Sequence, residues 1–207
     1  MAFTDFKSLE QSLVAFQIRS QKGNILSGDQ NAMPSQTLID DINFALTETA
    51  YNASEEAICE SIIYPILKEV WKPFRSELSL FSHKSINAGN LLVRTPDYLV
   101  AKRSHLGNIV LDTPLLITVE AKRDDFENAW GQCLAQMQAI TEINATKGLN
   151  IPVYGIVSNG LSWQIAELKE NVLTQNTDIY TLTDLEKLFA AMVELLENCV
   201  KKLKANN

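Results

Sequence analysis

The sequence is poor in cysteine, and its three thiols do not form a disulfide pattern. Cys59, Cys133 and Cys199 are odd in number, widely spaced and set in apolar helical patterns. Small secreted domains held together by disulfides instead carry even sets of closely spaced cysteines. We therefore expect three reduced thiols in the core and a cytoplasmic location.

Long apolar runs and a phosphate-binding loop are also missing. No basic segment followed by an apolar one opens the chain, and no run approaches the ~20 apolar residues that cross a bilayer, so we expect no membrane partner. A Gly-Lys-Ser loop is absent, which argues against an ATP-driven motor. His83 and His105 lie far from any cysteine, which argues against a zinc site.

Positive charge is scarce as well. The chain has 18 Lys and Arg against 25 Asp and Glu, a net charge of -7. Such a field repels phosphate backbones, so any contact with nucleic acid must be local, and bound cations must neutralise the site.

The chain has enough apolar residues for one core. It has 207 residues, of which 46% are hydrophobic, and we expect a single domain over 1–207. Apolar residues at spacings of three and four predict helices over 3–19 and 36–50. These two helices would form an N-terminal helical extension, 1–52, ahead of a core over 53–207.

The core alternates helical and extended patterns, which predicts an α/β fold with a central mixed sheet flanked by helices. Ser54 is a candidate N-cap for a helix that runs to about Trp71, and Asp124 with Glu127 resembles the capping box of a long helix. The last helix begins near Thr183. The expected strands are 77–81, 91–93, 97–101, 115–122, 151–157 and 163–168, with a short edge near 172–173 and 179.

Two carboxylates and a lysine are predicted to converge at the ends of two of these strands. Because side chains alternate along a strand, Glu120 and Lys122 project to one face. Asp97 follows Pro96 at the start of another strand, and pairing of the two strands would bring its carboxylate beside Glu120. Paired carboxylates suit a hard dication such as Mg²⁺, and Lys122 would then handle the attacking water or the charge on a phosphate.

The residues Pro96-Asp97 and Glu120-Ala121-Lys122 resemble the signature of the PD-(D/E)XK nuclease superfamily. The resemblance implies a restriction-endonuclease-like core and Mg²⁺-dependent hydrolysis of phosphodiester bonds, with Mn²⁺ as a substitute and DNA as the partner. The segments 54–57 and 62–67 further resemble the N-terminal nuclease domain of type I restriction enzyme motor subunits. This similarity covers about 54–170.

The same resemblance implies further site residues. A glutamate on the first core helix completes the metal site in that family, and Glu56 matches best, with Glu60 next and Glu55 also open. A glutamine on the helix after the lysine matches Gln132 better than Gln136. The helix carboxylates also suit the positive end of a helix dipole, and the glutamines also suit a polar helix face.

A different class of function remains open. A non-catalytic binding or assembly module could keep this fold and use its acidic surface to engage a second copy of the chain or another protein, and the net charge favours this alternative. A nuclease whose DNA affinity comes from a partner is a third hypothesis.

Overall fold

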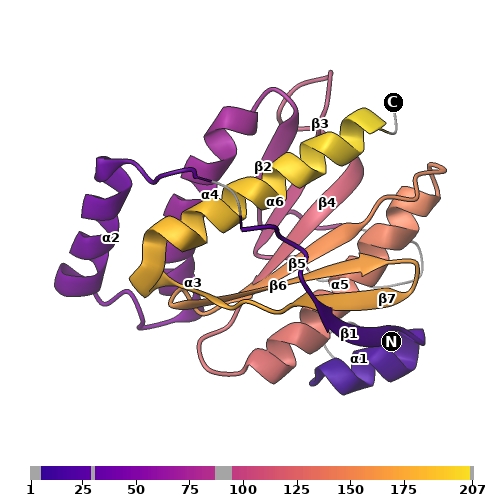
Figure 1. Cartoon of the computed structure of the whole chain (residues 1–207), viewed down its shortest axis with the longest axis horizontal. Coiled ribbons are helices and arrows are strands. Elements are labelled where there is room, and N and C mark those ends of the chain that lie inside the picture. Colours follow the sequence, from indigo (N-terminus) through magenta and orange to yellow (C-terminus); the bar gives the residue numbers. More distant parts are fainter. Residues whose placement is uncertain (1–5, 29–30, 87–94, 206–207) are drawn as a thin grey trace.

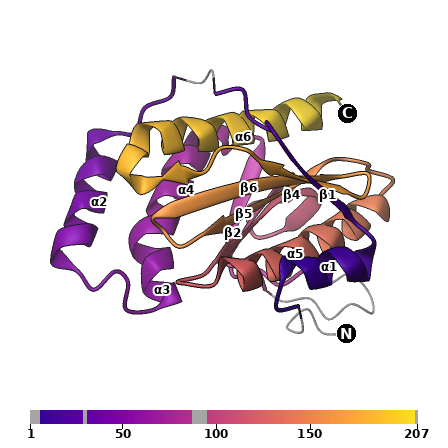
Figure 2. The same ribbon diagram turned by 60° about the horizontal axis from the view of Figure 1, so that its bottom comes forward.

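The computed structural model describes residues 6–28, 31–86 and 95–205, and it has the expected α/β architecture. A mixed eight-stranded sheet runs through the molecule, with helices on both faces (Figures 1 and 2). The strands are β1 (Arg19–Gly23), β2 (Leu78–Ser82), β3 (Tyr98–Arg103), β4 (Leu111–Ala121), β5 (Val153–Ser158), β6 (Ser162–Lys169), β7 (Val172–Asn176) and β8 (Tyr180–Thr181).

The strand order is β1-β7-β6-β5-β4-β3-β2, and β8 pairs with β6. The pairs β1–β7 and β4–β5 are parallel, and the other pairs are antiparallel. The parallel β4–β5 step needs a long connection, which α5 (Phe126–Ala145) provides. This crossover places the ends of β4 and β5 at the same edge of the sheet.

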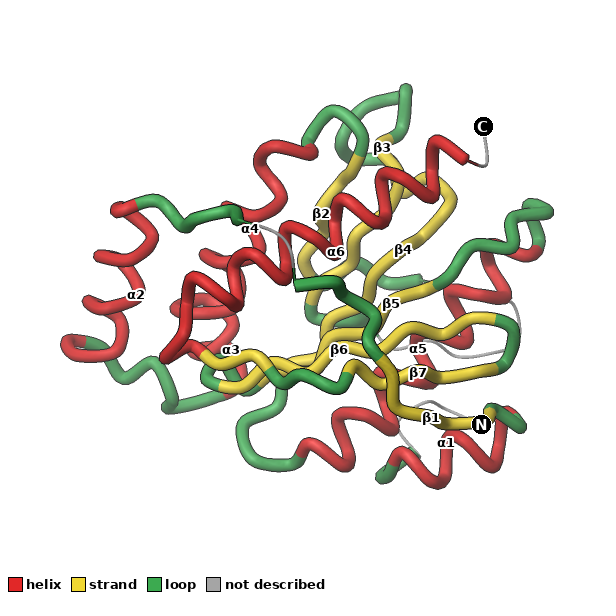
Figure 3. Tube along the Cα trace, viewed as in Figure 1, coloured by secondary structure: helices red, strands yellow, loops and turns green. Residues whose placement is uncertain are grey.

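Two apolar layers cover the sheet. On one face α4 (Tyr64–Trp71) and α6 (Leu185–Ala205) lie over strand residues such as Val100, Ile117 and Val119, and α2 (Gln36–Glu48) packs against α4. On the other face α5 and α1 (Leu9–Phe16) lie over Leu99 and Leu115. The trace in Figure 3 shows the helices on either side of the strands. Alternation along β3 thus supplies both cores, and on β4 the register shift between Val100 and Ala101 accompanies the change of face from Ile117 to Leu115.

The first core helix is continuous but changes its hydrogen bonding midway. It begins as α3 (Glu55–Ile58), capped by Ser54, passes through a π-helical turn (Cys59–Ile63) and continues as α4. The backbone N–H of Tyr64 donates to the Cys59 carbonyl, five residues back. Pro65 follows directly and has no N–H to donate, so the turn accommodates the proline without ending the helix.

The N-terminal segment is not only helical, which corrects our expectation for 1–52. Within the described residues the first helix covers only Leu9–Phe16, and Gln17 ends it in a left-handed conformation with φ of 54°. The chain then forms β1 at the sheet edge, where Arg19 pairs with Val172 of β7. The strand sequence Arg-Ser-Gln-Lys-Gly has no apolar alternation, so its pattern gave no sign of a strand.

Most other elements agree with the expectations within a few residues. The expected strand at 91–93 lies outside the described residues. Short helical turns precede β2 and α6, at Lys72–Phe74 and Leu182–Asp184. Strand β4 is longer than expected because it begins at Leu111, four residues earlier.

Candidate functional site

The candidate site lies where β3 begins and β4 ends. In this antiparallel pair Tyr98 is opposite Val119, and the next residues in that register are Asp97 and Glu120. The Asp97 Oδ2 atom accepts a hydrogen bond from the Ala121 backbone N–H at 2.7 Å. The strand pairing therefore holds Asp97 within one residue of Glu120 along β4.

Asp97 is a half-buried carboxylate with incomplete compensation of its charge. Burial raises its pKa above the usual range, and the Ala121 N–H and the nearby His83 lower it only in part. His83 Nε2 lies 3.7 Å from Asp97 Oδ1, and the His83 backbone N–H donates to the Asp97 carbonyl at 2.9 Å. An additional cation here would favour the ionised carboxylate.

Glu120 is held from the helix α5. Its side chain is 5% exposed, and Oε2 accepts a hydrogen bond from Gln136 Nε2 at 2.8 Å. The Gln136 Oε1 in turn accepts from the Thr118 hydroxyl, two residues back on the same strand face. This buried chain of Thr118, Gln136 and Glu120 fixes where the carboxylate lies.

Lys122 is paired with a carboxylate of the first core helix. Its Nζ lies 3.0 Å from Glu55 Oε2, and its backbone N–H donates to the Ser158 carbonyl at 2.9 Å. Residues 53–56 and 122–125 together line an open pocket of about 430 Å³. Lys122 and Glu55 thus meet at the wall of a cavity large enough for water and a phosphate group.

Glu56, our first choice among the helix carboxylates, is exposed at the helix N-terminus. Hydrogen bonds from its own backbone N–H and from Ser54 lower its pKa, and Lys122 and His83 contribute more weakly. Glu60 is also exposed, one turn further along. Of the three carboxylates, Glu55 forms the ion pair with Lys122.

The two glutamines of α5 are both buried and have different contacts. Gln132 Nε2 donates to Asn128 Oδ1 at 2.5 Å, whereas Gln136 donates to Glu120. Sequence reasoning preferred Gln132 and gave His83 no role. The spacing of one turn places both glutamines on one helix face, so only the packing of α5 on β4 could distinguish them.

The described part of the chain contains no group of three His, Cys, Asp or Glu side chains that could hold a metal ion. A metal at Asp97 and Glu120 would therefore have two protein carboxylates at most among the described residues. Mg²⁺ often binds through one or two carboxylates and keeps several waters. The donor chemistry of Asp97 and Glu120 is of this kind.

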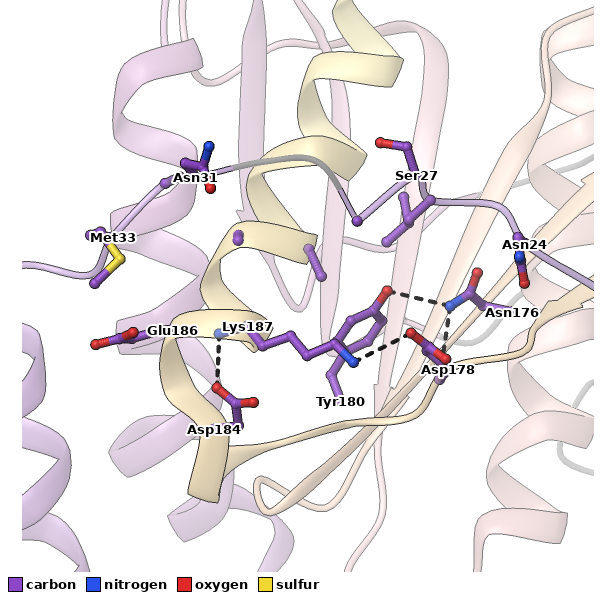
Figure 4. Close-up of a pocket in the computed structure, with 15 residues that line it drawn as sticks. Asn24, Ser27, Asn31, Met33, Asn176, Asp178, Tyr180, Asp184, Glu186 and Lys187 are labelled. Carbon is purple, nitrogen blue, oxygen red and sulfur yellow. Dashed lines mark hydrogen bonds and ion pairs between the residues drawn. The ribbon is translucent and has the colours of Figure 1, made fainter.

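A separate pocket of about 370 Å³ lies between the segment after β1, the β7–β8 connection and the start of α6. In Figure 4, Lys187 extends across Tyr180 to Asp178, and the Nζ to Oδ2 distance is 3.4 Å. Asn176 donates to the Asp178 carbonyl and to the Tyr180 hydroxyl. These polar groups bind one another, which is typical of a structural contact.

No protein-family model and no curated protein matches the chain. Among the described helices, none combines the length and the apolar content that a membrane crossing requires. A functional assignment therefore depends on the residues around β3, β4 and the first core helix.

Proposed function

We propose that the chain is a Mg²⁺-dependent nuclease with a restriction-endonuclease-like core, which hydrolyses phosphodiester bonds in DNA. The observation that carries the proposal is the register of β3 and β4. Tyr98 pairs with Val119, and continuing this antiparallel register by one residue puts Asp97 opposite Glu120. The succession of β3, β4, α5 and β5 also agrees with that of the PD-(D/E)XK core that the sequence resembles. Asp97 and Glu120 would hold Mg²⁺, for which Mn²⁺ would substitute.

When bound, the metal would polarise the phosphate and lower the pKa of a water molecule. Lys122 is suited to orient that water or to stabilise negative charge on the phosphate, because its ammonium lies at the wall of the open pocket. Glu55 holds Lys122 by an ion pair at 3.0 Å, so we assign Glu55, rather than Glu56, as its positioning carboxylate. Gln136 keeps the Glu120 carboxylate in place.

A non-catalytic module that retains the nuclease fold is the second candidate. Two observations favour it: the net charge of -7, and the lack of a three-residue metal group within the described residues. Such a module would engage a second copy of the chain or another protein through its acidic surface. It would need neither a divalent ion nor Lys122.

The two candidates differ in what a metal titration measures. We would titrate Mg²⁺ and Mn²⁺ calorimetrically into the wild type, Asp97→Asn and Glu120→Gln, and assay cleavage of single- and double-stranded DNA. Asp178→Asn is the matched control, because Asp178 also has a cationic partner but lies at the other pocket. We expect each site variant to weaken metal binding by about tenfold or more, a loss of about 1.4 kcal/mol, and the control to bind normally.

Lys122→Ala tests the chemical step. We expect it to lower the cleavage rate by about 100-fold or more while metal binding persists, since proton handling by a side chain contributes rate factors of this size. Lys169→Ala, which removes an exposed lysine beside Glu170, is the control and should cleave normally. If the wild type binds neither metal and cleaves neither DNA, the nuclease proposal fails and the second candidate replaces it.

A further inference from the structure

An aromatic pocket adjoins the candidate site. It has a volume of about 270 Å³, and its walls include the rings of Tyr64, Tyr98 and His83. The Tyr64 and Tyr98 rings are stacked with centroids 5.8 Å apart and planes 17° apart. His83 meets Tyr98 edge-on at 6.2 Å. Tyr64 is 38% exposed, so part of this aromatic surface faces solvent.

The pocket lies beside residues of the candidate site. His83 lines the pocket and lies 3.7 Å from Asp97, and Tyr98 is the next residue in the chain after Asp97. Glu56 lines both the aromatic pocket and the pocket that contains Lys122. A group bound among the rings would therefore be a close neighbour of a phosphate bound at Lys122.

The charges around the rings suit a base better than a phosphate. Glu56 and Glu60 are exposed carboxylates on the pocket wall, and a lowered pKa keeps Glu56 ionised. Carboxylates repel phosphate but accept hydrogen bonds from the exocyclic amino group of cytosine, as protein carboxylates do in base readout. The Lys68 ammonium lies 5.9 Å from the centre of the Tyr64 ring. There it would attract the phosphate backbone of a nucleic acid whose base is bound at the ring.

We propose that this pocket receives an unpaired nucleobase with an exocyclic amino group, so that the substrate is single-stranded beside the cleaved bond. The inference rests on the proposed nuclease function, because it identifies the ligand by its position next to that site. A base in a duplex is stacked on both faces and paired along its edge, so it enters such a pocket only when unpaired. Stacking on an aromatic ring then supplies binding energy that does not depend on a basic surface, which suits a chain with a net charge of -7.

The test measures binding in Ca²⁺, which replaces Mg²⁺ so that cleavage does not interfere. Fluorescence anisotropy would compare labelled oligo-dC and oligo-dT of roughly ten nucleotides, within the range that single-strand sites cover, with a hairpin duplex. The variants are Tyr64→Ala, Tyr64→Phe and Glu60→Gln. The matched control is Phe44→Ala, which removes an aromatic ring that is 62% exposed on α2.

We expect Tyr64→Ala to weaken oligo-dC binding about 5- to 100-fold, the range that stacking on one aromatic ring gives. Tyr64→Phe keeps the ring and should bind within about twofold of the wild type, as should Phe44→Ala. Glu60→Gln should reduce the preference for oligo-dC over oligo-dT. If Tyr64→Ala fails to fold by circular dichroism, the Glu60→Gln comparison decides.

The outcomes separate this inference from the nuclease proposal. Unchanged oligo-dC binding by folded Tyr64→Ala, or equal affinity for the hairpin duplex, would overturn the base pocket even if Lys122-dependent cleavage is found. Conversely, Tyr64-dependent binding of oligo-dC by a wild type that binds neither Mg²⁺ nor Mn²⁺ and cleaves neither DNA would keep the pocket and overturn the nuclease.

Discussion

At the scale of single residues, the carboxyl group of Asp97 is the most informative group in the molecule. It accepts the Ala121 N–H and lies beside His83, but burial still raises its pKa. Strand pairing thus holds Asp97 at a position where burial disfavours the ionised carboxylate. This cost is what a bound dication would remove.

Asp97→Asn should change the pH dependence of stability. The pKa of Asp97 is raised above its ordinary value of 3.8, so the folded chain binds this proton more tightly than the unfolded chain does. The stability that protonated Asp97 contributes is fully present below about pH 3.8 and is lost as pH rises through the folded-state pKa. Urea denaturation should show the free energy of unfolding of the wild type falling relative to Asp97→Asn over that window. A relative rise would contradict the shift.

Gln136→Leu should destabilise the fold. The substitution removes the hydrogen bond to Glu120 and leaves the buried Thr118 hydroxyl without the acceptor that it now has. We expect a loss of about 1–3 kcal/mol in the free energy of unfolding, the usual penalty for an unpaired buried polar group.

The control is Gln138→Leu on the same helix, where the side-chain amide donates to Glu142 Oε1 at 3.1 Å. Because this position is partly exposed, the substitution should change the free energy of unfolding by no more than about 0.5 kcal/mol. The free energy of unfolding would be measured by urea denaturation. If both variants lost the same amount, the hydrogen bonds that join Thr118, Gln136 and Glu120 would not stabilise the fold.

The sequence indicated which residues to group in a candidate site, but not the contacts that these residues make. Asp97, Glu120 and Lys122 could be proposed because strand alternation and the Glu-x-Lys spacing are local patterns. The partner of Lys122 could not, since Glu55 and Glu56 are neighbours in one helical turn and only the packing of that helix decides which one faces β4. His83 lies well before Asp97 in the sequence, and no local pattern connects the two.

At the scale of elements, the contact between α1 and α5 depends on a glycine, Gly131, because glycine has no side chain. A Cβ atom at Gly131 would lie 2.7 Å from the Ser8 carbonyl oxygen and 2.9 Å from its carbon. The Ser12 hydroxyl donates to the Gly131 carbonyl at 2.7 Å in the same crossing. The two backbones therefore approach closely where α1 reaches the long helix.

Gly131→Ala should destabilise the chain, contrary to the normal effect of this change. Within a helix, replacement of Gly by Ala usually stabilises by about 1 kcal/mol. Here the new methyl group meets backbone atoms of residue 8, and overpacking of this kind costs about 1–3 kcal/mol. Hydrogen exchange should also quicken across α1 before the rest of the molecule. A rise in melting temperature would show that α1 does not pack this way.

Elements were predictable from the sequence where burial imposes a pattern. The apolar run of β4 and the apolar face of α6 indicate their own structure, because both lie against the core. Strand β1 has no buried residue, and it is joined to β7 by backbone pairing and by a hydrogen bond from the Gln21 side chain to the Thr174 hydroxyl at 3.1 Å. The π-helical turn ahead of Pro65 was likewise missed, since a proline in a helical pattern predicts only a kink.

At the scale of the whole molecule, the acidic surface limits how nucleic acid can be bound. The net charge of -7 opposes phosphate at a distance, and the described cations at the two pockets include Lys122, Arg123 and Lys68. The proposed binding of nucleic acid would therefore depend on a few local contacts, on the metal and on base stacking.

Salt should weaken DNA binding only modestly. Three phosphate contacts to a single strand predict a slope of about -2 for log K against log salt concentration. Anisotropy titrations with oligo-dC across a range of potassium chloride concentrations, at constant Ca²⁺, would measure it. A slope steeper than about -5 would require about seven phosphate contacts and would mean that a basic surface, not this site, carries the binding.

The position of β1 has a consequence for how the chain is made. Figure 1 shows β1 beside β7, and the paired residues Arg19 and Val172 are separated by about 150 residues. At ribosomal rates of roughly 5–20 residues per second, the first strand leaves the exit tunnel on the order of ten seconds before its partner exists. Its residues Arg-Ser-Gln-Lys-Gly are polar or small throughout, so a nascent chain can carry this segment in water without an apolar edge that would recruit other chains.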